Sequence, residues 1–219
     1  MQNKGQSLLP RQSAPHGHSG TFSPDGTFAY FCDLGLDRIF GRRVVAESSA
    51  LEPLTVPDAS LKGGSGPRHF AFHPTLPVAY VINEIASTMT TLTYDAQTGA
   101  LNPVQSTSTL PGGDTTRNST AHVAVHPSGK WVYGSNRGHD SIARFNVDPS
   151  TGWLRFAEAA PSGGKTPRNF ALDPTGKWLL AAHQDSNDVI VHAVDQNTGA
   201  LKPPGSTLSV GRPVCVVFY

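Results

Sequence analysis

The chain has 219 residues, enough for one sizeable domain, and its formal net charge of +1 argues against an extensive nucleic-acid interface. Glycine (22 residues) and proline (18 residues) are abundant, and charged residues make up only 15%, which is typical of a turn-rich β protein rather than a disordered chain. No segment is apolar enough to span a membrane, and residues 1–12 lack the apolar core of a signal peptide. Cys32 and Cys215 lie in apolar runs, so we expect two buried free thiols and a reducing, cytoplasmic location.

Four related segments recur along the chain, and each contains a proline as its sixth or seventh residue. They are residues 18–26 (HSGTFSPDG), 69–77 (HFAFHPTLP), 122–130 (HVAVHPSGK) and 169–177 (NFALDPTGK). The shared prolines, which are separated by 50, 53 and 47 residues, are Pro24, Pro74, Pro127 and Pro174. A period near 50 without a helical pattern predicts an all-β fold, a β-propeller with one blade for each repeat.

We place four four-stranded blades in one propeller domain covering residues 1–219, at about residues 13–56, 66–108, 119–160 and 166–209. In chain order, the expected strands include residues 27–32, 38–44, 68–72, 78–83, 89–94, 131–136, 141–146, 178–183 and 188–194, with outer strands opening at 51 and 101. Residues 57–66, 111–118 and 162–165 are expected to link the blades. Residues 213–219 resemble an innermost strand without successors, so we expect a closing strand there.

Aspartates and several histidines fall where turns are expected. Turns favour Asp because its carboxylate accepts hydrogen bonds from nearby backbone N–H groups. We therefore interpret as turn residues, and not as catalytic acids, Asp25, Asp95, Asp148, Asp173 and Asp195. We expect structural roles in turns or outer strands for His73, His126, His139 and His192.

Adjacent strands of a blade are antiparallel, so the start of the first strand and the end of the second lie on the same rim. First strands bring His16, His18, Arg68, His69, His122, Arg168 and Asn169 to this rim, and second strands bring Asp33, Asn83, Glu84, Asn136, Arg137, His183 and Gln184. Because guanidinium forks match phosphate and carboxylate groups, the rim predicts a site for an anionic ligand. Glu84 is either a general acid or base, or an ion-pair partner of Arg68. For Arg137 the alternative to a functional role is a salt bridge on the rim. For His16 and His18 the alternative is a hydrogen-bonded turn.

The order of these motifs resembles the lactonase family of seven-bladed propellers. The resemblance rests on PHGHS at 15–19, GPRHF at 66–70, VINE at 81–84, GSNR at 134–137, TPRNF at 166–170 and the segment 213–218, and it covers residues 12–219. Seven blades at this period need about 350 residues, so the chain corresponds to the C-terminal four-sevenths of the family.

The resemblance implies a carboxylic ester hydrolase that opens a sugar lactone such as 6-phosphogluconolactone, a step of carbohydrate metabolism in the pentose phosphate pathway. It implies catalytic roles for His16, His18, Arg68, Glu84 and Arg137, with Glu84 or a histidine activating water. Substrate binding is expected from His69, Asn83, His122, Arg168, Asn169 and Gln184, with the arginines holding a phosphate or carboxylate.

Two alternatives remain open: a cyclase that interconverts a muconate and its lactone, like the carboxy-muconate lactonizing enzymes, and a non-catalytic propeller that binds partners. We expect no cofactor and no metal, because no His/Cys cluster has zinc spacing and the arginines beside Asn83, Glu84, Asn136 and Asn169 would repel a cation. The expected partner is a small anionic lactone, with no nucleic acid and no membrane. Uncovered blade edges predict self-association.

Overall fold

The structure is a computed structural model that describes residues 4–112 and 114–218. Its elements are β-strands and two short 3-10 helices, η1 (Pro10–Gln12) and η2 (Ala46–Ser48). The strands build antiparallel sheets, which confirms the all-β class. By its internal contacts the chain forms two compact units, Met1–Ser106 and Thr107–Tyr219, and each is described by itself.

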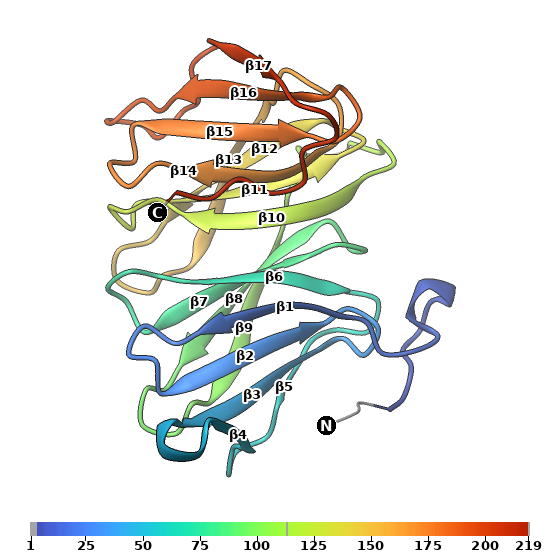
Figure 1. Cartoon of the computed structure of the whole chain (residues 1–219), viewed down its shortest axis with the longest axis vertical. Coiled ribbons are helices and arrows are strands. Elements are labelled where there is room, and N and C mark those ends of the chain that lie inside the picture. Colours follow the sequence, from blue (N-terminus) through green and yellow to red (C-terminus); the bar gives the residue numbers. More distant parts are fainter. Residues whose placement is uncertain (1–3, 113, 219) are drawn as a thin grey trace. The chain divides into compact units, whose positions relative to one another are not determined.

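The first unit contains two sheets in which the strands follow one another in chain order (Figure 1). The first sheet has β1 (Gly17–Phe22), β2 (Phe28–Asp33), β3 (Arg38–Val45) and β4 (Ala50–Pro53), with β5 (Ala59–Ser60) added beside β3. The second sheet has β6 (Pro67–Phe72), β7 (Val78–Asn83), β8 (Thr88–Tyr94) and β9 (Leu101–Ser108). The innermost strands of these sheets, β1 and β6, are neighbours.

The second unit repeats the same plan. Its first sheet runs through β10 (Ser119–Val125), β11 (Trp131–Arg137), β12 (Ser141–Val147) and β13 (Leu154–Pro161). Its second sheet runs through β14 (Pro167–Leu172), β15 (Trp178–His183), β16 (Asp188–Ala193) and β17 (Thr207–Ser209), with β14 beside β10. The four up-and-down sheets match the four predicted blades, which confirms the propeller-type repeat.

Three expectations about local structure were wrong. Residues 59–60 form β5 instead of plain linker, because β4 covers only Arg42–Val45 of β3 and β5 pairs with Arg38 and Ile39 at its other end. Residues 213–218 form no strand, and Tyr219 lies outside the described residues. Cys215 is exposed on this segment, whereas Cys32 is buried and its surroundings raise the pKa of the thiol to about 12 by desolvation.

The segment after β17 nevertheless follows the pattern of a blade entry. Asp140 Oδ1 accepts a hydrogen bond from the backbone N–H of Thr166, just before β14, at 2.9 Å. Asn187 Oδ1 accepts one from Arg212 N–H at 3.0 Å, just before Pro213. Farther along, the backbone N–H of Val216 donates to Asn169 Oδ1 at 2.8 Å, so side-chain acceptors hold this segment and a ladder of backbone bonds does not.

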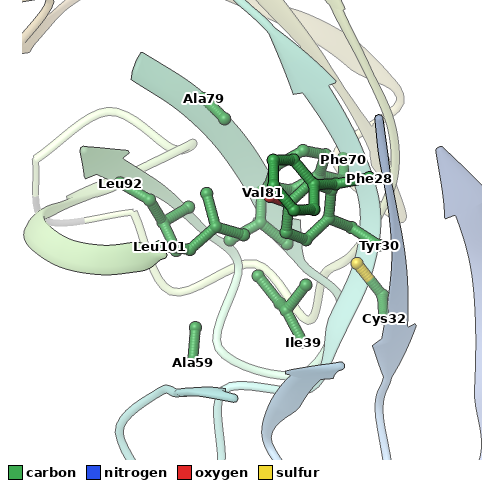
Figure 2. Close-up of a cluster of buried hydrophobic side chains, with 10 residues drawn as sticks. All are labelled: Phe28, Tyr30, Cys32, Ile39, Ala59, Phe70, Ala79, Val81, Leu92 and Leu101. Atoms are coloured by element: carbon green, nitrogen blue, oxygen red, sulfur yellow. The ribbon is translucent and has the colours of Figure 1, made fainter. Parts of the chain in front are cut away.

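The hydrophobic core of each unit lies between its two sheets. In the first unit, Phe28, Tyr30 and Ile39 of one sheet meet Phe70, Val81 and Leu92 of the other, and Cys32 lies at the edge of the cluster (Figure 2). All six residues of β7 are buried, because this strand is covered on both faces. In the second unit a cluster of the same kind gathers around Trp131, Tyr133 and Phe170. Burial of these aromatic rings is the main favourable contribution to folding.

The predicted turn residues are confirmed. Asp95, Asp148 and Asp195 each begin a turn and accept hydrogen bonds from the two backbone N–H groups two and three residues ahead. Such bonds stabilise the ionised form, and the hydrogen bond from Ser150 is the largest cause that lowers the pKa of Asp148 to about 2. Asp25 and Asp173 accept bonds inside the turns between first and second strands.

These turns also join neighbouring blades. The Tyr30 hydroxyl of the first sheet donates to the carbonyl of Gly99 in the second sheet at 2.8 Å. In the second unit, the Tyr133 hydroxyl donates to the carbonyl of Gly199 at 2.7 Å. Burial raises the pKa of both phenols, which therefore stay protonated as donors. In each unit, a buried tyrosine hydroxyl therefore adds a hydrogen bond to the apolar contact between the two sheets.

Candidate functional site in the first unit

The pairing registers confirm that first-strand starts and second-strand ends share a rim within each blade. Gly17 lies opposite Asp33, Pro67 opposite Asn83, Thr120 opposite Asn136 and Pro167 opposite His183. The predicted site residues follow from these pairs, and the structure assigns them to the two units separately. His16, His18, Arg68, His69, Asn83 and Glu84 belong to the first unit, and His122, Arg137, Arg168, Asn169 and Gln184 to the second.

Each first strand has a one-residue register shift at its start, of the kind a β-bulge produces. The extra residue is His18 in β1, Arg68 in β6 and Arg168 in β14, and β10 has its shift between Thr120 and Val123. Bulges redirect a side chain relative to the strand and are frequent beside active sites. The registers also correct the repeat alignment, because His18 corresponds to Arg68, and Ser19 corresponds to His69.

A buried ion pair forms the centre of the first-unit rim. Arg68 Nε donates to Glu84 Oε2 at 2.8 Å, and the two residues are only 2% and 8% exposed. Glu84 follows β7 directly, and its backbone N–H donates to the carbonyl of Gly66, which fixes the loop against the start of β6. The structure therefore shows the Arg68–Glu84 contact that was one of the two interpretations of Glu84.

His69 and His18 extend this pair along the rim. Arg68 Nη1 lies 3.0 Å from His69 Nε2. A guanidinium group only donates, so Nε2 must accept, and His69 is then a neutral imidazole that carries its proton on Nδ1. The His18 ring meets the His69 ring edge-on, with centroids 5.3 Å apart. Three of the predicted residues from two adjacent blades therefore make one connected group with Glu84.

Sequence reasoning missed Arg11, which belongs to this group. Its Nη2 lies 3.5 Å from Glu84 Oε1, the carboxylate oxygen that does not receive Arg68 Nε, and its side chain is 60% exposed. Arg11 lies in η1, before the first repeat, so no comparison between the repeats could identify it. The sequence did carry a weaker signal, because Arg11 stands immediately before Gln12, where the family resemblance begins.

The remaining predicted residues of this unit have supporting contacts. The Asn83 amide donates to the hydroxyls of Thr88 and Thr90, both at 2.8 Å, and so ties β7 to β8. The backbone N–H of His16 donates to Asp33 Oδ1 at 2.8 Å, and its side chain is exposed. The structure thus places His16 and Asn83 beside the central group, on the same rim, rather than in the ion pair itself.

A groove with both polar and apolar lining flanks the loop that carries Glu84. It has a volume of about 640 Å³ and includes Ser65, Ala86 and Thr88 in its lining, with further hydroxyls from Ser60, Thr90 and Ser106. The Arg68–Glu84 pair is not part of that lining. The groove therefore lies beside the loop of Glu84 but does not enclose the Arg68–Glu84 pair.

In the second unit the predicted residues make mostly structural contacts. Arg137 donates to the Ser119 hydroxyl at 2.8 Å and to the Thr120 carbonyl at 2.7 Å, so its guanidinium fastens β11 to β10. The His122 ring packs edge-on against Phe170, and Asn169 Oδ1 accepts the N–H of Val216. Arg168 is half-buried at its bulge, and Gln184 lies after β15, its amide 3.4 Å from Asp185.

The four histidines expected to be structural do hold local structure. His73 Nδ1 accepts backbone N–H bonds at its turn, and His126 Nδ1 accepts Ser128 N–H, so that His126 Nε2 donates to the carbonyl of Gly176. His139 faces Asp114 at 3.2 Å, and His192 Nε2 bonds the carbonyl of Ser162. His183, one of the residues predicted on the rim, forms a hydrogen bond through Nδ1 to Asp188 Oδ1 at 2.8 Å. Burial lowers the pKa of His183.

Across residues 4–112 and 114–218, no three His, Cys, Asp or Glu side chains gather into a metal-binding group. No helix in those residues is long and apolar enough to cross a membrane.

Comparison with known proteins identifies the family. A family model described as "Lactonase, 7-bladed beta-propeller" matches residues 1–218. The chain is 35% identical over 218 residues to 6-phosphogluconolactonase of Bacillus subtilis. This alignment covers 98% of the chain and 60% of the relative. Among solved structures, a protein from Lactobacillus plantarum superposes with a TM-score of 0.91 at 30% identity, covering 98% of this chain and 62% of the other.

A periplasmic gluconolactonase from Pseudomonas aeruginosa superposes with a TM-score of 0.89 at 30% identity, covering 96% of this chain and 59% of that one. The chain thus spans about 60% of the length of the relatives it matches. The fold, the repeat and these matches agree that the chain belongs to the lactonase family of seven-bladed β-propellers.

Proposed function

We propose that the protein hydrolyses a sugar lactone, with 6-phosphogluconolactone as the leading substrate, and that the reaction takes place at the Arg68–Glu84 pair. The observation that carries this proposal is the burial of that pair beside the exposed guanidinium group of Arg11. A buried ion pair is weak evidence for stability, because desolvation of both charges offsets most of their attraction. Its place at the rim of a lactonase-family blade supports a role in chemistry instead.

The chemistry follows from the groups present. Glu84, flanked by two guanidinium groups, is held as a carboxylate and can accept a proton from a water molecule. That water attacks the lactone carbonyl carbon, and negative charge develops on the carbonyl oxygen. The Nδ1–H of His69 would stabilise this charge. Cleavage of the ring C–O bond and return of the proton to the leaving oxygen give the open hydroxy acid.

The names of the relatives described above favour lactone hydrolysis over cyclisation of a muconate. The Bacillus subtilis relative is named for a phosphorylated lactone, and the Pseudomonas aeruginosa structure for gluconolactone. Unphosphorylated δ-gluconolactone is therefore a second candidate substrate. Roles for Arg137, Arg168, His122, Asn169 and Gln184 stay predictions, as do the single propeller domain, the pentose phosphate pathway and the cytoplasmic location.

The test is hydrolysis of 6-phosphogluconolactone by the parent chain and by Glu84→Gln, measured above the uncatalysed rate. Loss of a general base should lower kcat by about a hundredfold or more. The matched control is Glu52→Gln, which removes the same charge from an exposed position of β4. The control should keep the parent's kcat within about threefold.

Turnover by Glu84→Gln within a few-fold of the parent would show that Glu84 is not the base. Absence of turnover in the parent, on both 6-phosphogluconolactone and δ-gluconolactone, would contradict the proposed function. In that case the non-catalytic alternative gains support, and a Glu84→Gln variant that retains partner binding would be consistent with it.

A further inference from the structure

We propose that Arg11 is the residue that contacts the anionic group of the substrate and sets the preference for a phosphorylated over an uncharged lactone. This inference rests on the proposed function of the Arg68–Glu84 pair. It adds a specificity-determining residue from outside the repeats, and it names the phosphate ester as the group that this residue recognises.

The two arginines beside Glu84 differ in what they can still bind. Arg68 is 2% exposed, its Nε is committed to Glu84 and its Nη1 to His69. Arg11 is 60% exposed and meets Glu84 at 3.5 Å, a longer contact than the 2.8 Å bond from Arg68. A guanidinium group has five N–H donors, so Arg11 keeps donors for an incoming anion. Arg68 therefore positions Glu84, and Arg11 faces the ligand.

Although the side chain is exposed, the backbone that carries Arg11 is fixed. Its neighbour Gln12 is fully buried and donates through Nε2 to the carbonyl of Leu34 at 2.9 Å. Ser7, at the start of the same segment, donates through its hydroxyl to Asp37 Oδ2 at 2.6 Å. A polar anchor on each side of Arg11 limits where its guanidinium can reach. Preorganisation of this kind lowers the entropic cost of binding an anion.

The local charge also favours an anionic group. Glu84 is one carboxylate between two guanidinium groups, so the cluster of Arg11, Arg68 and Glu84 carries a net positive charge. A phosphate ester near Arg11 would be bound by charge-assisted hydrogen bonds, whereas the ring hydroxyls of an uncharged lactone would bind it more weakly.

The test compares kcat/KM for 6-phosphogluconolactone and for δ-gluconolactone in the parent chain and in Arg11→Gln. We expect the preference for the phosphorylated substrate to fall by about tenfold to a hundredfold, as expected for loss of charge-assisted hydrogen bonds. Arg11→Lys keeps the positive charge but loses the planar pair of guanidinium donors, so it should lose part of the preference for the phosphorylated lactone. Lys4→Gln removes one positive charge from the same exposed N-terminal segment, away from Glu84, and should leave the preference within about threefold.

A second readout does not depend on turnover. The affinity of each variant for the product 6-phosphogluconate, measured by calorimetry, should fall in Arg11→Gln by the same factor as the substrate preference. If the parent binds 6-phosphogluconate but does not hydrolyse the lactone, the proposed function fails and calorimetry still decides the role of Arg11.

Three results would overturn the inference. One is an equal loss on both lactones, which would mean that Arg11 acts only through Glu84. Another is an unchanged preference and an unchanged affinity for 6-phosphogluconate in Arg11→Gln. The third is a parent chain that hydrolyses δ-gluconolactone but neither hydrolyses the phosphorylated lactone nor binds its product, an outcome that leaves lactone hydrolysis intact.

Discussion

At the scale of single residues, the Arg68–Glu84 pair could be predicted as an interaction but not as a buried one. The sequence places Arg68 at the start of a first strand and Glu84 at the end of the second, and antiparallel pairing brings them to one rim. The one-residue bulge at Arg68, which turns its side chain into the protein, has no signature in the hydrophobic pattern. Comparison of the repeats could not identify Arg11, because it lies outside every repeat.

The contribution of the Arg68–Glu84 pair to stability can be separated from its contribution to activity. Arg68→Ala leaves Glu84 buried without its closest partner and should lower the free energy of unfolding by about 3–5 kcal/mol. Arg68→Met combined with Glu84→Leu replaces the whole pair with apolar volume and should restore most of that loss. Urea unfolding of the parent, the single and the double variant measures both effects.

The double variant should have no lactonase activity even though it is stable. A double variant that stays as unstable as Arg68→Ala would instead indicate that the pair is required for the fold. That result would remove the argument that the pair is retained for chemistry.

A second residue-scale prediction concerns pH. Burial lowers the pKa of His126 below its usual 6.5, with the Gly176 carbonyl and Asp173 opposing this shift. Between the folded-state pKa and 6.5 the unfolded chain binds more protons, so His126 contributes stability that is present above pH 6.5 and is lost as pH falls through the folded-state pKa. Unfolding by urea at pH 7.5 and 5.5 should show a smaller pH dependence in His126→Gln than in the parent. An equal dependence in both proteins would contradict this assignment.

At the scale of elements, the strands with strong hydrophobic patterns were predicted to within a residue or two. The expected strands 78–83 and 178–183 match β7 and β15. The two-residue β5 was missed because so short a strand carries no periodic pattern, and it forms only because β4 leaves part of β3 uncovered. The segment 213–218 was expected as a strand from its apolar pattern, yet strand formation also needs a neighbouring strand, which the pattern cannot show.

The element-scale prediction concerns the turn that joins the two blades of the second unit. Gly199 has a φ of +73°, and a Cβ added there would lie 2.4 Å from the Trp131 ring, so Gly199→Ala should combine backbone strain with overpacking. We expect a loss of about 2–4 kcal/mol in the free energy of unfolding. Gly26 has the same φ of +73° with no atom within 4 Å of an added Cβ, so Gly26→Ala should cost only about 1–2 kcal/mol.

Thermal unfolding of the two glycine variants provides the comparison. Equal losses of stability would mean that the turn does not press against Trp131. The contact between the sheets of the second unit would then depend mainly on the apolar cluster and on hydrogen bonds such as those of Tyr133, His126 and Arg144.

At the scale of the whole molecule, the chain holds four blades and spans about 60% of its relatives' length. In the second unit the segment after β17 exposes Val214, Val217 and Phe218, which are 52%, 72% and 42% exposed. Exposed apolar side chains on an unpaired segment favour association. We expect light scattering to give a mass above that of one 219-residue chain, and Val217→Lys to lower it. A single-chain mass at micromolar concentration would contradict the expected self-association.

The most direct test of the central claim is the rate of 6-phosphogluconolactone hydrolysis by this chain and by Glu84→Gln, on samples whose mass and thermal stability are recorded alongside. We expect turnover in the parent and a loss of about a hundredfold or more in Glu84→Gln, with Glu52→Gln retaining the parent's rate. A folded parent without turnover, or a Glu84→Gln variant that turns over like the parent, would contradict the assignment of lactone hydrolysis to the Arg68–Glu84 pair.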